Sequence, residues 1–171
     1  MDARRESEPT PMEMKNPTTV ERKSERELVV TRTFNGPARL VFEAWTKAEL
    51  FKRWWVPKSF PVTLLSCEMD ARVGGGYRLV FAADPSPKEF FGKYLEVTPP
   101  SRLVWSNDED EGGGAVTTVT LEEKGGKTLV VMHDLHPSKE ALDEGLGAYD
   151  AIAETFNQLE EVLGTLGAKA A

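Results

Sequence analysis

The sequence predicts an α+β fold in which a curved antiparallel β-sheet wraps around a long C-terminal α-helix, with two short helices after the first strand. Six β-rich runs between residues 60 and 136 are joined by short separators rich in Gly, Pro, Asp or Ser. This pattern is typical of an antiparallel meander, because parallel strands would need helices between them. Beyond residue 137, large apolar residues recur at helical spacing. Such a helix needs a broad apolar surface, and a curved sheet supplies one.

The N-terminal segment, residues 1–26, is expected to be a flexible polar tail. It mixes charges and carries three prolines, and it has too little apolar surface to offset the entropy lost on ordering. The folded domain is expected to span residues 27–167, with residues 168–171 as a C-terminal tail. The first strand is predicted at ELVVTRTF, which ends at the turn signal Asn35-Gly36-Pro37.

Two short helices are expected before Pro57. Pro37 suits the first turn of a helix, and the apolar residues that follow it recur at helical spacing: Leu40, Val41, Ala44 and Trp45. Thr46, with Glu49 three residues later, predicts a capping box at the start of the second helix.

The six β-rich runs are FPVTLLSCEMD, GGYRLVFAA, EFFGKYLEVT, RLVWSN, AVTTVTLEE and KTLVVMHDL. Ser138 then predicts the N-cap of an amphipathic helix of some seven turns. Gly145 and Gly147 interrupt this helix early, and each costs about 0.8–1 kcal/mol relative to Ala. Close approach to the sheet and room for a ligand explain these glycines equally well.

The composition restricts the class of protein. A chain of 171 residues is enough for one domain with a sizeable core. The net charge of −7 argues against a general nucleic-acid binder, which would need a basic face. Cys67 is the only cysteine, so no intramolecular disulfide forms and a reducing compartment fits best. No apolar run reaches the ~18 residues of a membrane span. We therefore expect a soluble, cytoplasmic protein.

Four segments, in this order, resemble one known family: RTFNGPARLVFEAWTKAELFKRWWVP, CEMDARVGGGYRLVF, GKYLEVTPPSRLVWSN and TTVTLEEKGGKTLVVMHDLHPSKEALD. They are similar to the bacterial activator of heat-shock-protein-90 ATPase homologue-like proteins. These belong to the START-like, polyketide-cyclase-like SRPBCC superfamily. The resemblance, over residues 27–166, implies a helix-grip fold and a container for hydrophobic small molecules. It does not imply co-chaperone activity, because the eukaryotic co-chaperones carry an additional N-terminal domain. Ala151 and Ile152 stand where the family pattern shows Gly and then an aromatic residue or Met.

Two adjacent tryptophans, Trp54 and Trp55, are the first candidates for a ligand site. Adjacent residues on a helix point about 100° apart, so one narrow apolar stripe cannot hide both rings. We expect at least one of them to line a cavity, and the sequence leaves open which one. The other candidates for an apolar wall are Phe81, Tyr94, Trp105 and Tyr149. The side chains expected to orient a polar end of a ligand are Arg78, Asp70 and His133.

Strand alternation divides these candidates into faces. Tyr77, Leu79 and Phe81 share one face of their strand, and Arg78 lies on the opposite face. Phe90 and Tyr94 share a face of the next strand, but parity alone does not decide which face is inward.

The predicted function is binding of a hydrophobic or amphipathic small molecule, such as a lipid, a polyketide or an aromatic metabolite. A cyclase- or hydrolase-type enzyme that uses His133 or a pocket carboxylate is the less favoured alternative. A co-chaperone-like interaction domain, which would need an exposed apolar patch, is the third. His133 and His136 lie three apart on a predicted strand and cannot hold one metal together. We assign no catalytic residue, metal or cofactor, and leave monomer and homodimer both open.

Overall fold

A computed structural model describes residues 17–60, 62–108 and 114–170. Its main element is an eight-stranded sheet in the order β1-β2-β8-β7-β6-β5-β4-β3, with every neighbouring pair antiparallel. The strands are β1 (Thr19–Arg22), β2 (Glu27–Phe34), β3 (Leu64–Met69), β4 (Gly76–Phe81), β5 (Lys88–Thr98), β6 (Arg102–Ser106), β7 (Val116–Lys124) and β8 (Lys127–Leu135). The helices are α1 (Ala38–Thr46), α2 (Ala48–Phe51), α3 (Lys139–Gly145), the 3₁₀ segment η2 (Leu146–Ala151) and α4 (Ile152–Ala170).

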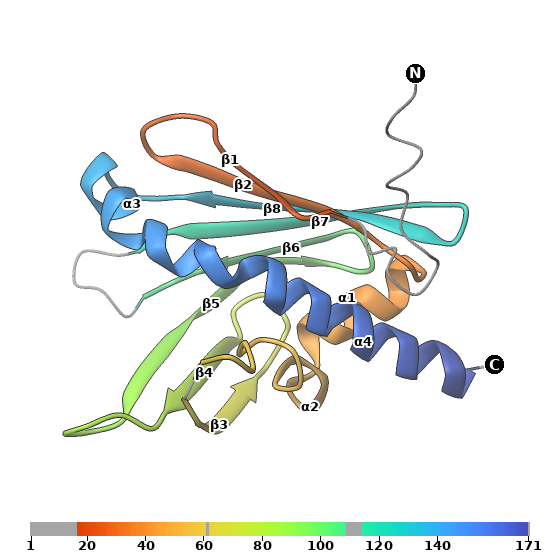
Figure 1. Cartoon of the computed structure of the whole chain (residues 1–171), viewed down its shortest axis with the longest axis horizontal. Coiled ribbons are helices and arrows are strands. Elements are labelled where there is room, and N and C mark those ends of the chain that lie inside the picture. The colour runs from red at the N-terminus through yellow and green to blue at the C-terminus, as the bar shows by residue number, and fades with distance from the viewer. Residues whose placement is uncertain (1–16, 61, 109–113, 171) are drawn as a thin grey trace.

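These elements form the predicted α+β helix-grip fold. Helix α4 crosses one face of the sheet, and α1 and α2 lie beside its C-terminal half (Figure 1). In β2 the inward residues alternate with outward ones, because side chains point to opposite faces along a strand. Their partners on α4 lie on one helical face: Phe156, Leu159, Val162 and Leu163. The rings of Phe34 and Phe156 meet edge to face with their centroids 5.4 Å apart.

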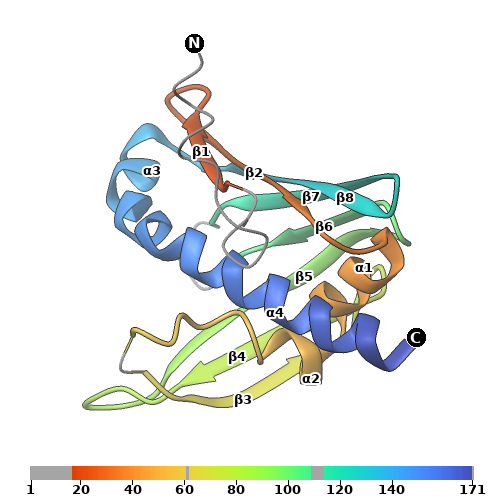
Figure 2. The same cartoon turned by 45° about the vertical axis from the view of Figure 1, so that its right-hand side comes forward.

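The sheet bends along β5. This strand pairs with β4 through Lys88 to Lys93 and with β6 through Tyr94 to Thr98, and the register shifts between Tyr94 and Glu96. Such irregularities bend a strand and increase its local twist. As a result, β3 and β4 lie on one side of α4, and β2, β7 and β8 lie on the other (Figure 2). The bend leaves space between α4 and the lower half of the sheet.

The prediction of a flexible tail over residues 1–26 is wrong for its last part. Residues 19–22 form β1, which pairs with β2 from Thr19 opposite Thr31 to Arg22 opposite Leu28. All four β1 residues are exposed, so backbone hydrogen bonds hold this edge strand and no apolar pattern reveals it. Residues 1–16 lie outside the described part of the chain. At the other end α4 continues to Ala170, beyond the predicted domain boundary at residue 167.

The sequence predicts one C-terminal helix of some seven turns, but in the structure this helix is interrupted. Ser138 is the N-cap as predicted, and its hydroxyl accepts the backbone N–H of Ala141 at 3.1 Å. The helix then gives way to the 3₁₀ segment η2 at Leu146, in the region of Gly145 and Gly147. A Cβ added at Gly147 would meet no atom within 4 Å, so close packing does not explain that glycine. The break redirects the chain before α4 crosses the sheet.

The predicted capping box at Thr46 is also wrong. Thr46 is the last residue of α1, and its hydroxyl donates to the carbonyl of Phe42 at 2.8 Å. Helix α2 instead begins after Lys47, with no side-chain cap.

Candidate functional site

A cavity of about 380 Å³ lies between the bent sheet and the start of α4. Its sheet wall comes from β3 to β6, and its other walls come from α1, α2, the loop after α2, and the η2–α4 junction. The described lining residues are Trp45, Phe51, Trp55, Val56, Pro57, Phe60, Val62, Met69, Tyr77, Leu79, Phe81, Phe90, Tyr94, Trp105, Asn107, Ala151, Ile152 and Thr155. Nearly all of these side chains are apolar or aromatic. The volume lies within the range of small-molecule sites.

The sheet wall is set by strand alternation. Tyr77, Leu79 and Phe81 all face the cavity, and so do Phe90 and Tyr94. The structure therefore shows that Phe90 and Tyr94 are on the inward face of β5, which strand alternation alone did not decide. The ring centroids of Tyr77 and Tyr94 lie 6.0 Å apart, and those of Phe81 and Phe90 lie 5.6 Å apart. In both pairs the rings meet edge to face, a favourable arrangement for aromatic pairs.

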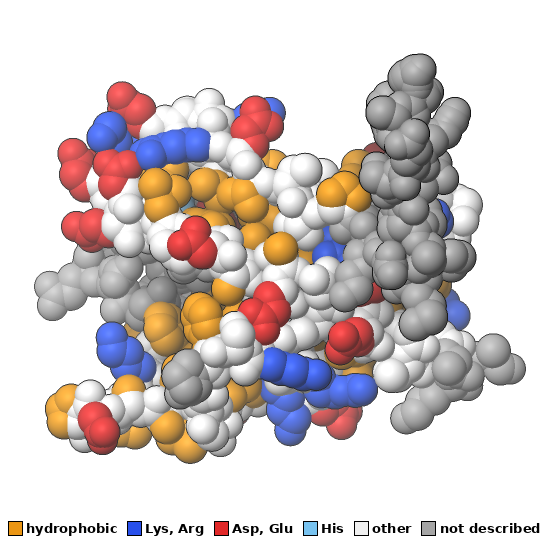
Figure 3. Space-filling view, viewed as in Figure 1, with side chains coloured by type: hydrophobic (Ala, Val, Ile, Leu, Met, Phe, Trp, Pro, Cys, Tyr) orange, Lys and Arg blue, Asp and Glu red, His pale blue; other side chains and the backbone are white. Residues whose placement is uncertain are grey.

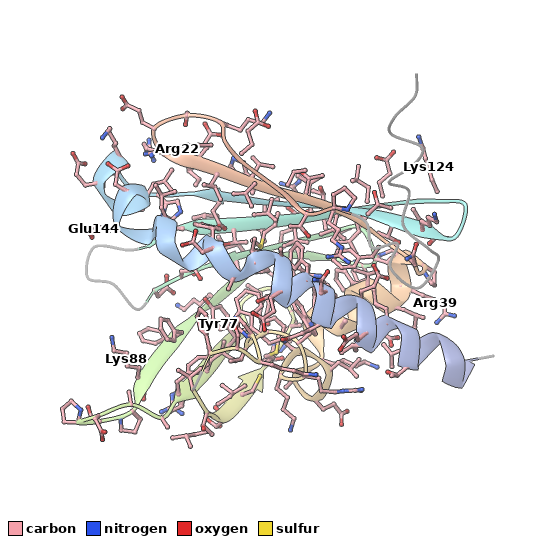
Figure 4. All side chains as sticks on the ribbon, viewed as in Figure 1. Arg22, Arg39, Tyr77, Lys88, Lys124 and Glu144 are labelled. Atoms are coloured by element: carbon pink, nitrogen blue, oxygen red, sulfur yellow. The ribbon has the colours of Figure 1, made fainter. Side chains whose placement is uncertain are left out.

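Gly92 allows this wall to form. A Cβ at Gly92 would lie 1.8 Å from the carbonyl oxygen of Ser106 and 2.9 Å from the ring of Tyr77. Any side chain here would therefore push β5 away from β6 and displace Tyr77. Figure 4 shows Tyr77 in the space between α4 and the lower strands.

The two adjacent tryptophans have different roles. Trp54 is fully buried, donates its Nε1–H to the carbonyl of Ala44 at 3.0 Å, and does not belong to the cavity lining. Trp55 lines the cavity and stacks on Phe51 with a centroid distance of 4.7 Å. The open choice is thereby answered in favour of Trp55. Trp54 packs in the core instead, against the rings of Trp45, Phe51 and Phe156.

The loop that carries Trp55 is fastened to α4 by Gln158. The amide of Gln158 donates to the carbonyls of Trp54 at 3.1 Å and Val56 at 2.8 Å, and its Oε1 accepts the N–H of Lys58 at 2.8 Å. Ser59 is held by two further hydrogen bonds to Glu154. This side of the cavity is therefore fixed to the helix by side-chain hydrogen bonds.

The cavity opens at an apolar rim. Phe60, Val62 and Phe90 line it and are also exposed, at 48%, 43% and 39% of their surface. Hydrophobic side chains gather on this face between the start of α4 and the β4–β5 hairpin (Figure 3). An apolar molecule would therefore meet apolar surface before it enters.

Of the predicted site residues, Trp55, Phe81, Tyr94 and Trp105 lie around the cavity. Arg78 does not, because it lies on the outer face of β4, where its guanidinium pairs with Glu89. His133 does not either, since it is on the outer face of β8 and its Nε2 lies 2.8 Å from Oε1 of Glu27. Both placements follow from strand parity.

Asp70 and Tyr149 are likewise outside the described lining of the cavity. Asp70 forms an exposed ion pair with Arg72, as expected for a turn. Tyr149 donates its hydroxyl to Oδ2 of the buried Asp134, and His136 Nε2 lies 3.1 Å from the same hydroxyl. Because the tyrosine proton points to Asp134, the imidazole must donate to the tyrosine oxygen.

The sequence analysis named both histidines but chose His133 for the site, and it did not predict this polar cluster around His136. Thr117 donates to Oδ1 of Asp134, and Asn107 donates to the hydroxyl of Thr117 at 3.2 Å. Burial lowers the pKa of His136, against the opposing effect of Asp134, and burial raises the pKa of Tyr149. A sign of it in the sequence was the inward parity of Asp134, the charged residue among the inward positions of β8, with Thr128, Val130 and Met132. The cluster ties η2 to β8.

A comparison with protein families matches residues 35–164 to the family described as activator of Hsp90 ATPase homolog 1-like protein. The match covers well over half of the chain. The chain belongs to this family. Among curated proteins, no relative matches it.

Solved structures from bacteria share this family fold. A protein from Nitrosomonas europaea is 27% identical, with a TM-score of 0.74, and the match covers 85% of this chain and 99% of that one. A protein from Staphylococcus epidermidis is 29% identical, with a TM-score of 0.71, and the match covers 86% and 94%. A protein from Rhodobacter sphaeroides is 21% identical, with a TM-score of 0.77 and coverage of 88% and 99%, a similarity that concerns the fold alone.

Ala151 and Ile152, noted in the sequence analysis, both line the cavity at the point where η2 passes into α4. They therefore form part of the wall of the candidate site.

Two further observations concern the described residues alone. Among the helices of residues 17–60, 62–108 and 114–170, none has the length and apolarity needed to cross a membrane. In the same ranges, no three His, Cys, Asp or Glu side chains are arranged to hold a metal ion.

Proposed function

We propose that the chain binds a hydrophobic or amphipathic small molecule in the cavity between the sheet and α4. The observation that supports this proposal is the cavity itself, which combines a volume of about 380 Å³, an aromatic lining and an exposed apolar rim. A ligand-binding domain is also what the family suggests in general terms. Affinity would come from apolar burial, at about 25 cal/mol per Å² before the costs of association are subtracted.

The size of the cavity limits the ligand. An apolar cavity of roughly 150 Å³ holds a benzene molecule, so about 380 Å³ suits two or three fused rings or a chain of similar bulk. Aromatic metabolites, small polyketides and short lipids all fit this limit. Affinity for long fatty acids would require part of the chain to lie outside the rim.

No observation favours the enzyme alternative. The described lining contains neither a histidine nor a carboxylate that could act as a general base. The co-chaperone alternative needs a broad exposed patch, whereas the exposed rings at Phe60 and Phe90 border the cavity mouth. The cytoplasmic location and the homodimer stay predictions from the sequence.

Native mass spectrometry of freshly purified protein, together with titration of tryptophan fluorescence by flavonoids, small polyketides and medium-chain lipids, tests the proposal. Ala151→Phe places a ring in the cavity wall and is expected to weaken binding by tenfold or more, roughly the effect of 1.4 kcal/mol. Ala153→Phe is the matched control, because Ala153 lies two residues further on, is exposed, and is outside the lining. Absence of any bound compound at 100 µM, or equal binding by both variants, would refute the proposal.

A further inference from the structure

The indole N–H of Trp45 is a buried donor without an acceptor. Trp45 is 1% exposed and lines the cavity, and within the described residues its Nε1 has no hydrogen-bond partner. Buried polar groups are almost always hydrogen-bonded, so each exception asks for an explanation. Trp54, in the turn after α2, provides the contrast, because its N–H is satisfied by the carbonyl of Ala44.

A second polar side chain, Tyr94, also lines the cavity, and Trp105 links it to Trp45. Tyr94 is Trp105's cross-strand partner, and the Trp105 ring lies 5.8 Å from the ring of Trp45. Among the described residues the Tyr94 hydroxyl makes no hydrogen bond, and burial raises its pKa well above the ordinary value. The hydroxyl therefore stays protonated and can donate. By contrast, the Tyr77 hydroxyl already donates within the wall, with Asn107 Oδ1 at 2.9 Å and the Ser106 carbonyl at 3.0 Å.

The cavity lacks a charge that could balance an ion. Every described lining residue is apolar, aromatic or neutral and polar, with no Lys, Arg, His, Asp or Glu. The labelled Lys88 lies at the outer end of β5, apart from Tyr77 (Figure 4). The ionisable groups whose charge acts on Tyr94 are Cys67 and Asp70, and both raise its pKa. An anion would thus lose its hydration and gain no counter-charge, which is strongly unfavourable.

From these observations we infer that the cavity takes an uncharged molecule with a carbonyl-type acceptor, to which Trp45 Nε1–H and the Tyr94 hydroxyl donate. A carbonyl oxygen has two lone pairs and accepts from both donors. The inference rests on the proposed function and specifies its ligand class as neutral ketones, esters, quinones or lactones rather than carboxylates or phosphates. Apolar burial supplies the affinity, and the two donors fix the orientation.

Three probes of matched shape separate the effects of apolar burial, of a carbonyl acceptor and of a negative charge. They are naphthalene, 2-acetylnaphthalene and 2-naphthoate, each titrated into the full chain at pH 7.5. The ketone is expected to bind about 5- to 100-fold more tightly than naphthalene, the usual net gain from two hydrogen bonds. The carboxylate is expected to bind at least about 30-fold more weakly than the ketone. Calorimetry measures the affinities. The assigned Trp45 indole N–H resonance in ¹H–¹⁵N NMR spectra is expected to move downfield with the ketone only.

Tyr94→Phe removes one donor and keeps the ring. Because the hydroxyl makes no hydrogen bond in the described structure, the variant is expected to fold with unchanged stability. It is expected to lose about half of the free-energy preference for ketone over naphthalene, because Trp45 still donates. Tyr149→Phe is the matched control, since it also deletes a hydroxyl, but one that is bonded to Asp134 outside the lining. Its preference for the ketone is expected to match that of the natural chain.

The outcomes are distinguishable. If none of the probes binds, the proposed function fails, and this inference fails with it. If the probes bind but the carboxylate equals the ketone, the binding function stands and the inference is overturned. The inference is equally overturned if the ketone binds without moving the Trp45 resonance, or if Tyr94→Phe keeps the full preference.

Discussion

Gln158 offers a sharp test of how the cavity wall is held. Its side chain is 5% exposed and makes three hydrogen bonds to the backbone of the loop after α2: to Trp54, to Val56 and from Lys58. The substitution Gln158→Leu keeps a side chain of similar bulk and removes all three. It leaves two carbonyls and one N–H of this loop without their present partners.

The expected cost follows from these contacts. Each hydrogen bond contributes about 0.5–1.5 kcal/mol net, so three contribute about 1.5–4.5 kcal/mol. Burial of the leucine offsets part of this loss, which gives an expected destabilisation of about 2–3 kcal/mol. In a chain of this size 1 kcal/mol shifts Tm by about 2–4 °C, so the expected fall in Tm is about 4–12 °C.

Thermal unfolding followed by circular dichroism measures the effect of Gln158→Leu. Glu161→Leu is the control, because Glu161 is an exposed residue on the same helix whose nearest cation, Lys58, is 3.9 Å away. That control is expected to change stability by no more than about 0.5 kcal/mol. Hydrogen exchange of the Lys58 amide should accelerate in the Leu variant alone. A Tm within 2 °C of the natural chain, with Lys58 still protected, would show that Gln158 does not hold this wall.

Two further predictions concern stability. Glu160→Gln is expected to lower the free energy of unfolding by about 1–3 kcal/mol, because it weakens the ion pair with the almost fully buried Arg32. The control Glu161→Gln should lower it by less than about 0.5 kcal/mol. Chemical denaturation compares the two variants, and equal effects would contradict the reasoning. Burial lowers the pKa of His136 below 6.5, although the charge of Asp134 acts to raise it. The unfolded chain therefore binds a proton at this histidine more readily than the folded chain does. Neutral His136 thus contributes stability that is present above pH 6.5 and is lost as the pH falls through the folded pKa. Tm measured from pH 7.5 to 5 should fall less in His136→Asn than in the natural chain, and parallel curves would rule this out.

Most of the fold could be predicted because its strands alternate and its last helix is amphipathic. In β2 and β8 every second residue is buried, and a period of two is visible in the sequence. Strand β1 carries no such pattern, because all four of its residues are exposed. The start of η2 was equally hidden. Glycines at 145 and 147 signal a weak helix, but only the tie between Tyr149 and Asp134 shows where the segment is fixed.

The cavity was predictable as a set of aromatic residues but not as a geometry. Strand alternation predicted that Phe81 shares a face with Tyr77 and that Tyr94 shares a face with Phe90. Which of these faces points into the cavity depends on the bend of β5. The sequence did not show that Trp54 packs in the core with its N–H bonded to Ala44, while Trp55 lines the cavity. Trp45 looked like ordinary core, because helical spacing cannot show that its N–H lacks an acceptor.

The volume of the cavity bears on why it is open. A closed, dry void of about 380 Å³ would cost about 9 kcal/mol at about 24 cal/mol per Å³, which is comparable to the net stability of a whole domain. The exposed rim at Phe60 and Phe90 makes the space accessible, so a ligand can fill it and stabilise the fold by about 2.7 kcal/mol at 100 times its Kd. Ala151→Phe fills part of the same space. We therefore expect it to raise Tm in the absence of ligand and to reduce the further rise that ligand produces. A fall in the Tm of Ala151→Phe, with no rise in the Tm of the natural chain on adding ligand, would show that the space is already filled by the protein's side chains.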